Sequence, residues 1–484
     1  MSILQVVDWK SLKPNGNGMQ LEPLLAAQPK LASAAHAVRQ SSNRLNAINV
    51  DELMPQISSP LIQARSELSS LRDGLDSAAD VAQILPSMMG QGAPRSYLLL
   101  VQNNAELRAT GGIPGALAIV TVNKGKLSIG GQTSATALGP ADPRVEVDPE
   151  QQQIYTTRMG KFMQDVNLTP DFPTAALTAK SMWQQKTGQK VDGVLAIDPV
   201  ALGYVLEATG PVQVSDPALK ELSHGTLPEE LTAKNIVTTL LSDVYTKIPE
   251  PELQDLYFAG VAREVFAKLS SGSGDAQRLI DVLSRGASER RVQLWSAHTS
   301  EQAVVSKYPI SGSITGDNVY PSQFGVYFND GTGAKMDFYI KRTVQLIEEC
   351  PVNGYAEVKA RVTSTNTAPK DAATSLPDYV TGGGIFGVPP GSVQTNVTAY
   401  GPVQSHIETV FVAGKKTGFA SYRHSGRPVG AITVRLAPGE SSTIDFNFGK
   451  IVQHAVPQVS VTPTLQSQKE VALPPRTAEC IPPA

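Results

Sequence analysis

The spacing of apolar residues changes twice along this chain, and the three patterns predict three kinds of structure. Between Leu21 and Leu85, apolar and small residues recur every seven positions in two stretches, which predicts two helices paired through a coiled-coil seam. The next part mixes short apolar runs with helical spacing, which is typical of a mixed α/β core. From Phe324 onward, short alternating strands and turn residues are typical of an immunoglobulin-like β-sandwich.

These patterns divide the 484 residues into four predicted segments. They are an antiparallel helical hairpin (1–90), a mixed α/β core (91–323), a β-sandwich (324–455) and an extended proline-rich tail (456–484). In the hairpin, we expect Leu24, Leu31, Leu61 and Leu68 to share one seam. The predicted fold class is therefore multi-domain α+β.

Composition excludes several classes of function. The chain has 41 basic and 44 acidic residues and a net charge of −3, so no overall field attracts nucleic acid, and we expect no nucleic-acid partner. No apolar run approaches the ~18 residues of a membrane span, and the start lacks the pattern of a signal peptide. The six histidines are scattered singly, and neither a P-loop nor a GxSxG motif occurs.

The candidate site lies in the stretch Ser96–Ile129. Tyr97–Val101 and Ala116–Val122 are apolar runs of the length of buried strands, and the residues between them read as a polar, glycine-rich loop. The candidate ligand-binding residues of this loop are Asn103, Asn104, Glu106, Arg108, Thr110, Gly111 and Gly112. A polar loop between two strands is a common arrangement for a binding site, because the strands provide a rigid scaffold for the loop. A hairpin loop whose amides only cap one another is the alternative.

Asp198 lies between a predicted strand, Val194–Ile197, and Pro199. Asp before Pro is a helix N-cap signature, so we expect a helix from Val200 to Thr209. A metal or acid–base role for Asp198 is the alternative to this cap. With Val212–Val214 as the next strand, the segment predicts a βαβ-like unit.

Two further elements follow from local patterns. The apolar spacing from Asp275 to Trp295 predicts one helix. Asp-Gly within Asn329–Gly333 predicts the turn of a β-hairpin.

Cys350 and Cys480 are the two cysteines of the chain, 130 positions apart. This spacing excludes a thiolate zinc cage and is compatible with two inert thiols or with one disulfide. We expect the disulfide, because it would join the tail to the sandwich. Such a bond indicates an oxidising compartment.

Several motifs together resemble a bacterial family known as domain of unknown function 4012, particularly its actinobacterial members. They are Tyr97–Gly112, Pro170–Pro173, Val191–Gly193, Ile197–Pro199, Thr209–Val212 and Asn329–Lys335. The resemblance implies an extracytoplasmic protein of the cell envelope with an N-terminal membrane anchor ahead of the helical hairpin. This sequence lacks that anchor, so we expect membrane contact only through a segment absent from it.

The apolar strand, the arginine-bearing loop and the unit from Asp198 to Val214 are more distantly similar to LytR-CpsA-Psr proteins. Those proteins transfer glycopolymers from a polyprenyl pyrophosphate carrier to peptidoglycan, and arginines and an aspartate hold magnesium and the pyrophosphate. Arg108 matches the first of these arginines, but Ala109 and Thr110 replace the expected Ser-Asp. The later arginine cluster is replaced by Lys234, Lys247, Arg263 and Lys268.

Two functions of different classes follow. In the first, an envelope protein binds a cell-wall glycopolymer, a lipid-linked saccharide or a protein partner through the Asn103–Gly112 loop. In the second, a divergent metal-assisted phosphotransferase acts on a polyprenyl-pyrophosphate-linked glycopolymer. The second function assigns Mg²⁺ to Glu106 and Asp171, and the pyrophosphate to Arg108 with Arg290 or Arg291. It requires these side chains to converge, and whether the chain is an enzyme stays open.

Overall fold

The computed structural model describes residues 18–271 and 274–480. The first residues of the predicted hairpin segment and the last four of the predicted tail lie outside the described residues. The described chain divides into two compact units. The first contains the residues up to Ser96 with Val120–Gly130 and Phe266–Ile280, and the second contains Tyr97–Ile119, Gly131–Val265 and the residues from Asp281 onward.

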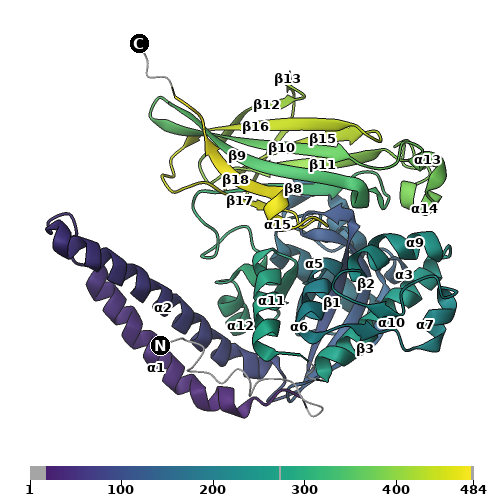
Figure 1. Cartoon of the computed structure of the whole chain (residues 1–484), viewed down its shortest axis with the longest axis horizontal. Helices are drawn as coiled ribbons and strands as arrows, with labels where there is room; N and C mark the ends of the chain where they lie inside the picture. Colours follow the sequence, from purple (N-terminus) through teal and green to yellow (C-terminus); the bar gives the residue numbers. More distant parts are fainter. Residues whose placement is uncertain (1–17, 272–273, 481–484) are drawn as a thin grey trace. The chain divides into compact units, whose positions relative to one another are not determined.

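A pair of long helices, α1 (Glu22–Asn46) and α2 (Pro55–Met88), dominates the first unit (Figure 1). Leu24 and Leu31 of α1 are buried with Ala78 and Ala82 of α2 in one apolar cluster. At the other end of the pair, the Arg65 guanidinium donates to the carbonyl of Leu45 at 2.8 Å. The prediction of an N-terminal helical pair is therefore confirmed. Leu61 and Leu68 are partly buried.

A five-stranded sheet forms the centre of the mixed α/β part, in the order β3-β2-β1-β4-β7. Its strands are β1 (Arg95–Arg108), β2 (Gly111–Asn123), β3 (Lys126–Ser134), β4 (Gly193–Ile197) and β7 (Val292–Ser296). β1 runs parallel to β4, with Leu99 opposite Leu195, and β4 runs antiparallel to β7.

Helix α5 (Phe172–Thr187) packs on this sheet. Leu98 and Leu100 of β1 and Val194 of β4 share one buried core with Phe172 and Met182 of α5. The further helices are α3 (Ala135–Leu138), α4 (Pro149–Tyr155), α6 (Pro199–Thr209), α7 (Pro217–Leu222), α8 (Ile236–Thr238), α9 (Val244–Lys247), α10 (Pro251–Ser270), α11 (Ala276–Ser288) and α12 (Thr299–Val305). Short 3₁₀ turns cover Thr157–Gly160, Met163–Asp165, Pro309–Ser311 and Met336–Tyr339, and a π-helical turn covers Thr239–Asp243.

The helix cap predicted at Asp198 is confirmed. Its Oδ1 accepts a hydrogen bond from the backbone N–H of Ala201 at 2.7 Å, and α6 begins at Pro199. The βαβ-like unit is wrong, because β5 (Val212–Gln213) leaves the central sheet. It pairs with β6 (Glu230–Leu231) in a separate two-stranded sheet.

The helix predicted from Asp275 to Trp295 is also too long. Helix α11 ends at Ser288, and Arg290 adopts a left-handed backbone with φ 59° that cannot continue a helix. The chain then turns into β7, whose backbone groups pair with the free edge of β4.

The C-terminal part contains two sheets that bury one common core. Phe324 and Phe328 from one sheet share this core with Leu346, Phe446 and Phe448 from the other. The six-stranded sheet has the order β13-β12-β16-β10-β9-β18 and the five-stranded sheet the order β14-β15-β11-β8-β17. The part is thus a sandwich of two facing sheets, and its immunoglobulin-like type stays a prediction.

The strands of the six-stranded sheet are β9 (Ile340–Val352), β10 (Tyr355–Asn366), β12 (His406–Val412), β13 (Lys415–Thr417), β16 (Ser441–Ile451) and β18 (Ala472–Thr477). The strands of the five-stranded sheet are β8 (Gln323–Asp330), β11 (Val393–Tyr400), β14 (Ala420–His424), β15 (Arg427–Leu436) and β17 (Gln458–Val461). Short helices α13 (Ala372–Ser375) and α14 (Asp378–Thr381) lie between β10 and β11 in the chain.

The turn at Asn329–Gly333 does not close a hairpin, because β8 and β9 belong to different sheets. This segment instead crosses from one sheet to the other. The crossing positions Asp330 and Lys335 beside the candidate site described below.

The segment from residue 456 contributes one edge strand to each sheet. β17 pairs in parallel with β8, β18 pairs in parallel with β9, and helix α15 (Gln468–Val471) lies between them in the chain. Cys480 forms a disulfide with Cys350 of β9, with Cα atoms 5.5 Å apart.

None of the helices in the described residues is both long enough and apolar enough to span a membrane.

Candidate functional site

Residues 103–112 are not a loop. β1 continues to Arg108 and β2 starts at Gly111, so only Ala109 and Thr110 form the turn. Glycine is required where the strands meet, because a Cβ atom on Gly112 would lie 2.1 Å from the backbone carbon of Asn103. The loop prediction is wrong because distant segments of the chain supply partners for these polar residues, which therefore do not need solvent.

The end of β1 is anchored in the sandwich. Leu107 is fully buried within the sandwich core, and its backbone N–H donates to Asp337 Oδ2 at 2.9 Å. The N–H of Ala109 donates to Asn329 Oδ1 at 2.9 Å, and the Ala109 carbonyl accepts from the hydroxyl of Thr462 at 3.0 Å. The predicted site segment is thus also the connection between the α/β part and the sandwich.

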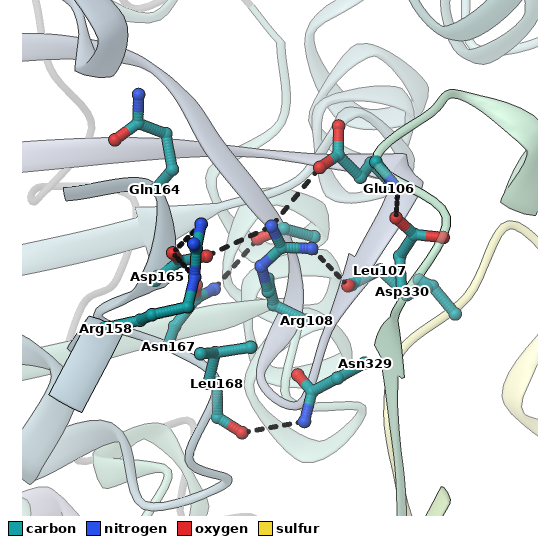
Figure 2. Close-up of polar contacts among 12 residues, drawn as sticks. Glu106, Leu107, Arg108, Arg158, Gln164, Asp165, Asn167, Leu168, Asn329 and Asp330 are labelled. Atoms are coloured by element: carbon teal, nitrogen blue, oxygen red, sulfur yellow. Dashed lines mark hydrogen bonds and ion pairs between the residues drawn. The ribbon is translucent and has the colours of Figure 1, made fainter. Parts of the chain in front are cut away.

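Glu106 and Arg108 form an ion network with three residues from other segments, and all of its members except Arg158 are buried or nearly so. Arg108 Nη2 lies 3.2 Å from Glu106 Oε1 and 3.2 Å from Asp165 Oδ1. Asp165 also pairs with Arg158 at 2.8 Å, and Glu106 Oε2 pairs with Lys335. Figure 2 shows Arg108 between the carboxylates of Glu106 and Asp165. Glu106 and Arg108, both candidate site residues from the sequence, therefore contact each other, and the second acid at Arg108 is Asp165 and not Asp171.

Burial and charge shift the pKa values in this network. Burial alone would raise the pKa of Glu106, but the positive charges of Lys335 and Arg108 lower it below its usual value. Burial alone would lower the pKa of Arg108. The negative charges of Glu106 and Asp165 outweigh this effect and raise the pKa of Arg108 above its usual value. Both side chains are therefore ionised at neutral pH. Asp330 differs, because burial and the nearby Asp337 raise its pKa to about 7.

The network forms part of the wall of a cavity of about 1550 Å³ in the second unit. Strand positions on β8, β11, β14 and β15 form another part, including Asn329, Asn396 and Thr433. Aromatic rings also line it, namely those of Tyr155, Phe162, Tyr379, Phe386, Phe419 and Tyr422. The cavity thus combines charged, hydrogen-bonding and aromatic groups, as ligand sites commonly do.

The other predicted residues of β1 and β2 have structural partners. Asn104 Nδ2 donates to Asp198 Oδ2 at 3.2 Å and to the carbonyl of Pro463. Asn103 donates to the hydroxyl of Tyr245. The hydroxyl of Thr110 accepts from Asn167 Nδ2 at 2.9 Å, and that amide also donates to the carbonyl of Gly112. These contacts hold the β1–β2 hairpin in place. Gly111 has φ 147° and lies against Gln102.

Asp171 and Arg290 are held away from the ion network. Asp171 caps α5, where its Oδ2 accepts from the Thr174 hydroxyl at 2.7 Å and its Oδ1 accepts from the N–H of Ile314 at 3.3 Å. Arg290 donates to the backbone carbonyls of Gly312 and Pro170. Neither side chain lines the cavity around Glu106.

Arg291 belongs to a second buried cluster. Its guanidinium pairs with Asp198 at 2.8 Å and with Glu289 at 2.9 Å, and it donates to the carbonyl of Gln466 at 2.9 Å. The side chains of Arg291 and Asp198 are both 0% exposed. The predicted pyrophosphate clamp of Arg108 with Arg290 or Arg291 is therefore not assembled.

The magnesium prediction finds no matching donor set. Glu106 already has Arg108 and Lys335 on its two oxygens, and Asp171 is engaged in its cap. In the parts of the chain that the structure describes, no three His, Cys, Asp or Glu side chains are grouped to hold a metal ion. The residues proposed for Mg²⁺ do not fit that ion in this arrangement.

Sequence reasoning missed Asp165, Asp330 and Lys335. Asp330 and Lys335 lie in the Asn329–Lys335 motif, so the motif itself was an available signal. Asp165 ends a short 3₁₀ turn, Met163–Asp165, and lies outside every motif that the sequence analysis singled out.

Comparison with known proteins supports the family resemblance. Residues 92–245 match the family described as "Protein of unknown function (DUF4012)", so the resemblance is confirmed over that segment. The actinobacterial type stays a prediction. No curated protein matches the chain.

Solved structures show only distant likeness. Protein gbs0355 from Streptococcus agalactiae is 16% identical over 47% of this chain and 76% of that chain, with a TM-score of 0.30. The Lin1025 protein from Listeria innocua is 14% identical over 45% and 79%, with a TM-score of 0.26. The transcriptional regulator yvhJ from Bacillus subtilis is 15% identical over 44% and 76%, with a TM-score of 0.21. With TM-scores this low, these likenesses carry no argument, and the similarity to LytR-CpsA-Psr proteins stays a prediction.

Proposed function

We propose that this protein is an extracytoplasmic protein of the cell envelope that binds a saccharide of the cell wall, either in a glycopolymer or in a lipid-linked precursor. The binding site is the cavity beside Glu106 and Arg108, and it replaces the loop from Asn103 to Gly112 as the proposed contact surface. The observation that carries this proposal is the composition of the cavity, which combines aromatic rings with polar and charged groups over about 1550 Å³.

This composition matches the chemistry of a saccharide. A sugar ring presents hydroxyl groups at its edge, which donate and accept hydrogen bonds, and C–H groups on its faces, which pack on aromatic rings. Asn396 and Thr433 supply an amide and a hydroxyl group from adjacent strands. The Thr433 hydroxyl donates a hydrogen bond to Asn396 Oδ1 at 2.6 Å. Tyr379 and Phe386 supply rings that are 45% and 65% exposed. The volume exceeds the roughly 300–1,000 Å³ of ordinary small-molecule sites, which favours an oligosaccharide.

The disulfide between Cys350 and Cys480 supports the extracytoplasmic location. Structural disulfides form and persist in oxidising compartments and are rare in a reducing cytoplasm. The resemblance to an envelope family points to the same location.

We do not carry forward the metal-assisted phosphotransferase. It requires Glu106, Asp171, Arg108 and Arg290 or Arg291 around one cavity, and Asp171, Arg290 and Arg291 have partners elsewhere. No observation favours that function over saccharide binding.

The test is calorimetric titration of the full chain with soluble cell-wall polysaccharide fragments. Wild-type protein should bind at least one fragment, and the double variant Tyr379→Ala/Phe386→Ala should bind it at least about tenfold more weakly, since truncating a residue that dominates binding costs ~2 kcal/mol or more and ~1.4 kcal/mol is a factor of ten. Tyr320→Ala is the matched control, because Tyr320 is 59% exposed and does not line the cavity. Equal loss in the control, or no binding of any fragment, would refute the proposal.

A further inference from the structure

We propose that the part of the ligand that enters the cavity is an uncharged saccharide, recognised through its hydroxyl groups and ring faces, and not a phosphate or pyrophosphate group. This inference rests on the proposed function and narrows it to one class of ligand. Its basis is the pairing of the charged side chains that line the cavity.

The cations of the cavity wall already have carboxylate partners. In the described part of the chain, the positively charged residues lining the cavity are Arg108, Arg158 and Lys335. Arg108 pairs with Glu106 and Asp165, Arg158 pairs with Asp165, and Lys335 pairs with Glu106. A phosphate that paired with Arg108 or Lys335 would compete with Glu106 or Asp165 for these buried cations, and displacing either acid would leave that carboxylate buried without its cation.

Acidic side chains outnumber basic ones on the same wall. Asp330 and Asp378 join Glu106 and Asp165, so four acids face three cations among the described lining residues. Burial raises the pKa of Asp330 to about 7, so part of its population is neutral at physiological pH. The wall is then close to neutral or weakly negative, and it provides no field that attracts an anion.

Neutral hydroxyl groups suit such a wall, because each can donate to a carboxylate and accept from an N–H group. The guanidinium of Arg158 belongs to a side chain that is 62% exposed. It can therefore donate to a hydroxyl without leaving Asp165. Asn396 and Thr433 are exposed on the neighbouring strands β11 and β15 and offer uncharged donors and acceptors.

The rim of the cavity supplies the apolar contacts. Phe386 lies against Gly333, where a Cβ atom would come within 2.5 Å of the ring. Tyr379 lies with its ring centroid 5.7 Å from Lys335 Nζ. Packing of sugar-ring faces on these rings needs no charge on the ligand.

The first experiment compares neutral and anionic ligands on the full chain by calorimetry. The probes are neutral hexasaccharides of galactose, mannose, arabinose and N-acetylglucosamine, the same saccharides with a terminal phosphate, and inorganic pyrophosphate. Each is measured at about 0.05 M and about 0.5 M NaCl, since salt screens an ionic interaction and leaves a neutral one nearly unchanged.

We expect one neutral saccharide to bind with a Kd that changes less than about twofold with salt. Its phosphorylated form should bind no more tightly, and pyrophosphate should not bind. Binding of pyrophosphate, or tighter and salt-sensitive binding of a phosphorylated saccharide, would overturn this inference while leaving saccharide binding intact. Failure of every saccharide to bind would instead overturn the proposed function, and this inference with it.

The second experiment removes the shared partner of two cations. Glu106→Gln leaves Arg108 and Lys335 without that carboxylate, so pyrophosphate should now bind where it did not before. Asp445→Asn is the matched control, because it removes the partner of the exposed Arg361, which does not line the cavity. A folded Glu106→Gln protein without pyrophosphate binding would contradict the claim that ion pairing excludes anions. Should that variant not fold, Asp165→Asn, which unpairs Arg158, provides the same test.

Discussion

Asp330 should make the protein less stable as the pH rises from about 5 to about 8. The residue is 9% exposed, and it accepts hydrogen bonds from the N–H groups of Thr332 and Gly333 at 3.0 and 2.7 Å. Burial first, and the charges of Asp337 and Glu106 next, raise its pKa from 3.8 to about 7. Between those two pKa values the folded state retains a proton that the unfolded state has released, so stability falls as the pH rises.

The size of this effect follows from the two pKa values. One pKa unit corresponds to roughly 1.4 kcal/mol, so the retained proton contributes roughly 3 kcal/mol at pH ~5 and almost nothing at pH ~8. The substitution Asp330→Asn removes the titrating group, and its stability profile should lack this fall. His424 acts in the opposite direction, because burial lowers its pKa. Since His424 is present in both proteins, the difference between their profiles isolates Asp330.

Urea unfolding across this pH range provides the assay, with the disulfide intact and with fluorescence of Trp183 and Trp295 as the signal. Both tryptophans lie in the same compact unit as Asp330. The wild-type free energy of unfolding minus that of Asp330→Asn should fall by roughly 2–3 kcal/mol from pH ~5 to pH ~8. The variant also loses one carboxylate oxygen that accepts from Gly333, which shifts its whole profile, so the slopes are compared. Parallel profiles would refute the reasoning.

Three further predictions concern stability. Asp198→Ala removes a helix cap and the partner of a fully buried arginine, so urea unfolding should show a loss of about 3–5 kcal/mol; a loss below ~1 kcal/mol would contradict it. Replacing Cys350 and Cys480 by Ala removes a link between residues 130 positions apart, and the free energy of unfolding should fall by about 2–5 kcal/mol. Thiol titration of the unreduced, denatured wild type should find no free thiol. Gly112→Ala places a Cβ atom 2.1 Å from backbone and should lower the melting temperature strongly, whereas Gly115→Ala meets no atom within 4 Å and should not.

Local signals explain the parts of the fold that the sequence predicts well. The sevenfold repeat around Leu24 and Leu31 depends only on spacing within each helix, and the cap at Asp198 depends only on its immediate neighbours. The wrong predictions concern β5, which was placed in the central sheet, and β7, which was predicted as helix. Their cause is not local. Strand pairing depends on partners far away in the chain, and a short apolar run does not reveal which edge it will join.

The same distinction explains the candidate site. Glu106 and Arg108 are two positions apart on one strand, so the sequence could bring them together. Their other partners, Asp165 and Lys335, come from 57 positions beyond Arg108 and 229 positions beyond Glu106. Asp171 shares its residue type with Asp165, and only the three-dimensional structure shows that it caps a helix. Charge type alone could not distinguish the two aspartates.

The edge strands β17 and β18 also determine when the sandwich can be completed during synthesis. The ribosome makes β8 and β9 more than 100 residues before the strands that pair with them in parallel. Until β17 and β18 emerge, the backbone groups of β8 and β9 on that side have no strand partner, and exposed edges of this kind pair readily with other chains. A truncated chain that ends before Gln458 should therefore aggregate more readily than the full chain, because these two edges then have no strand partner.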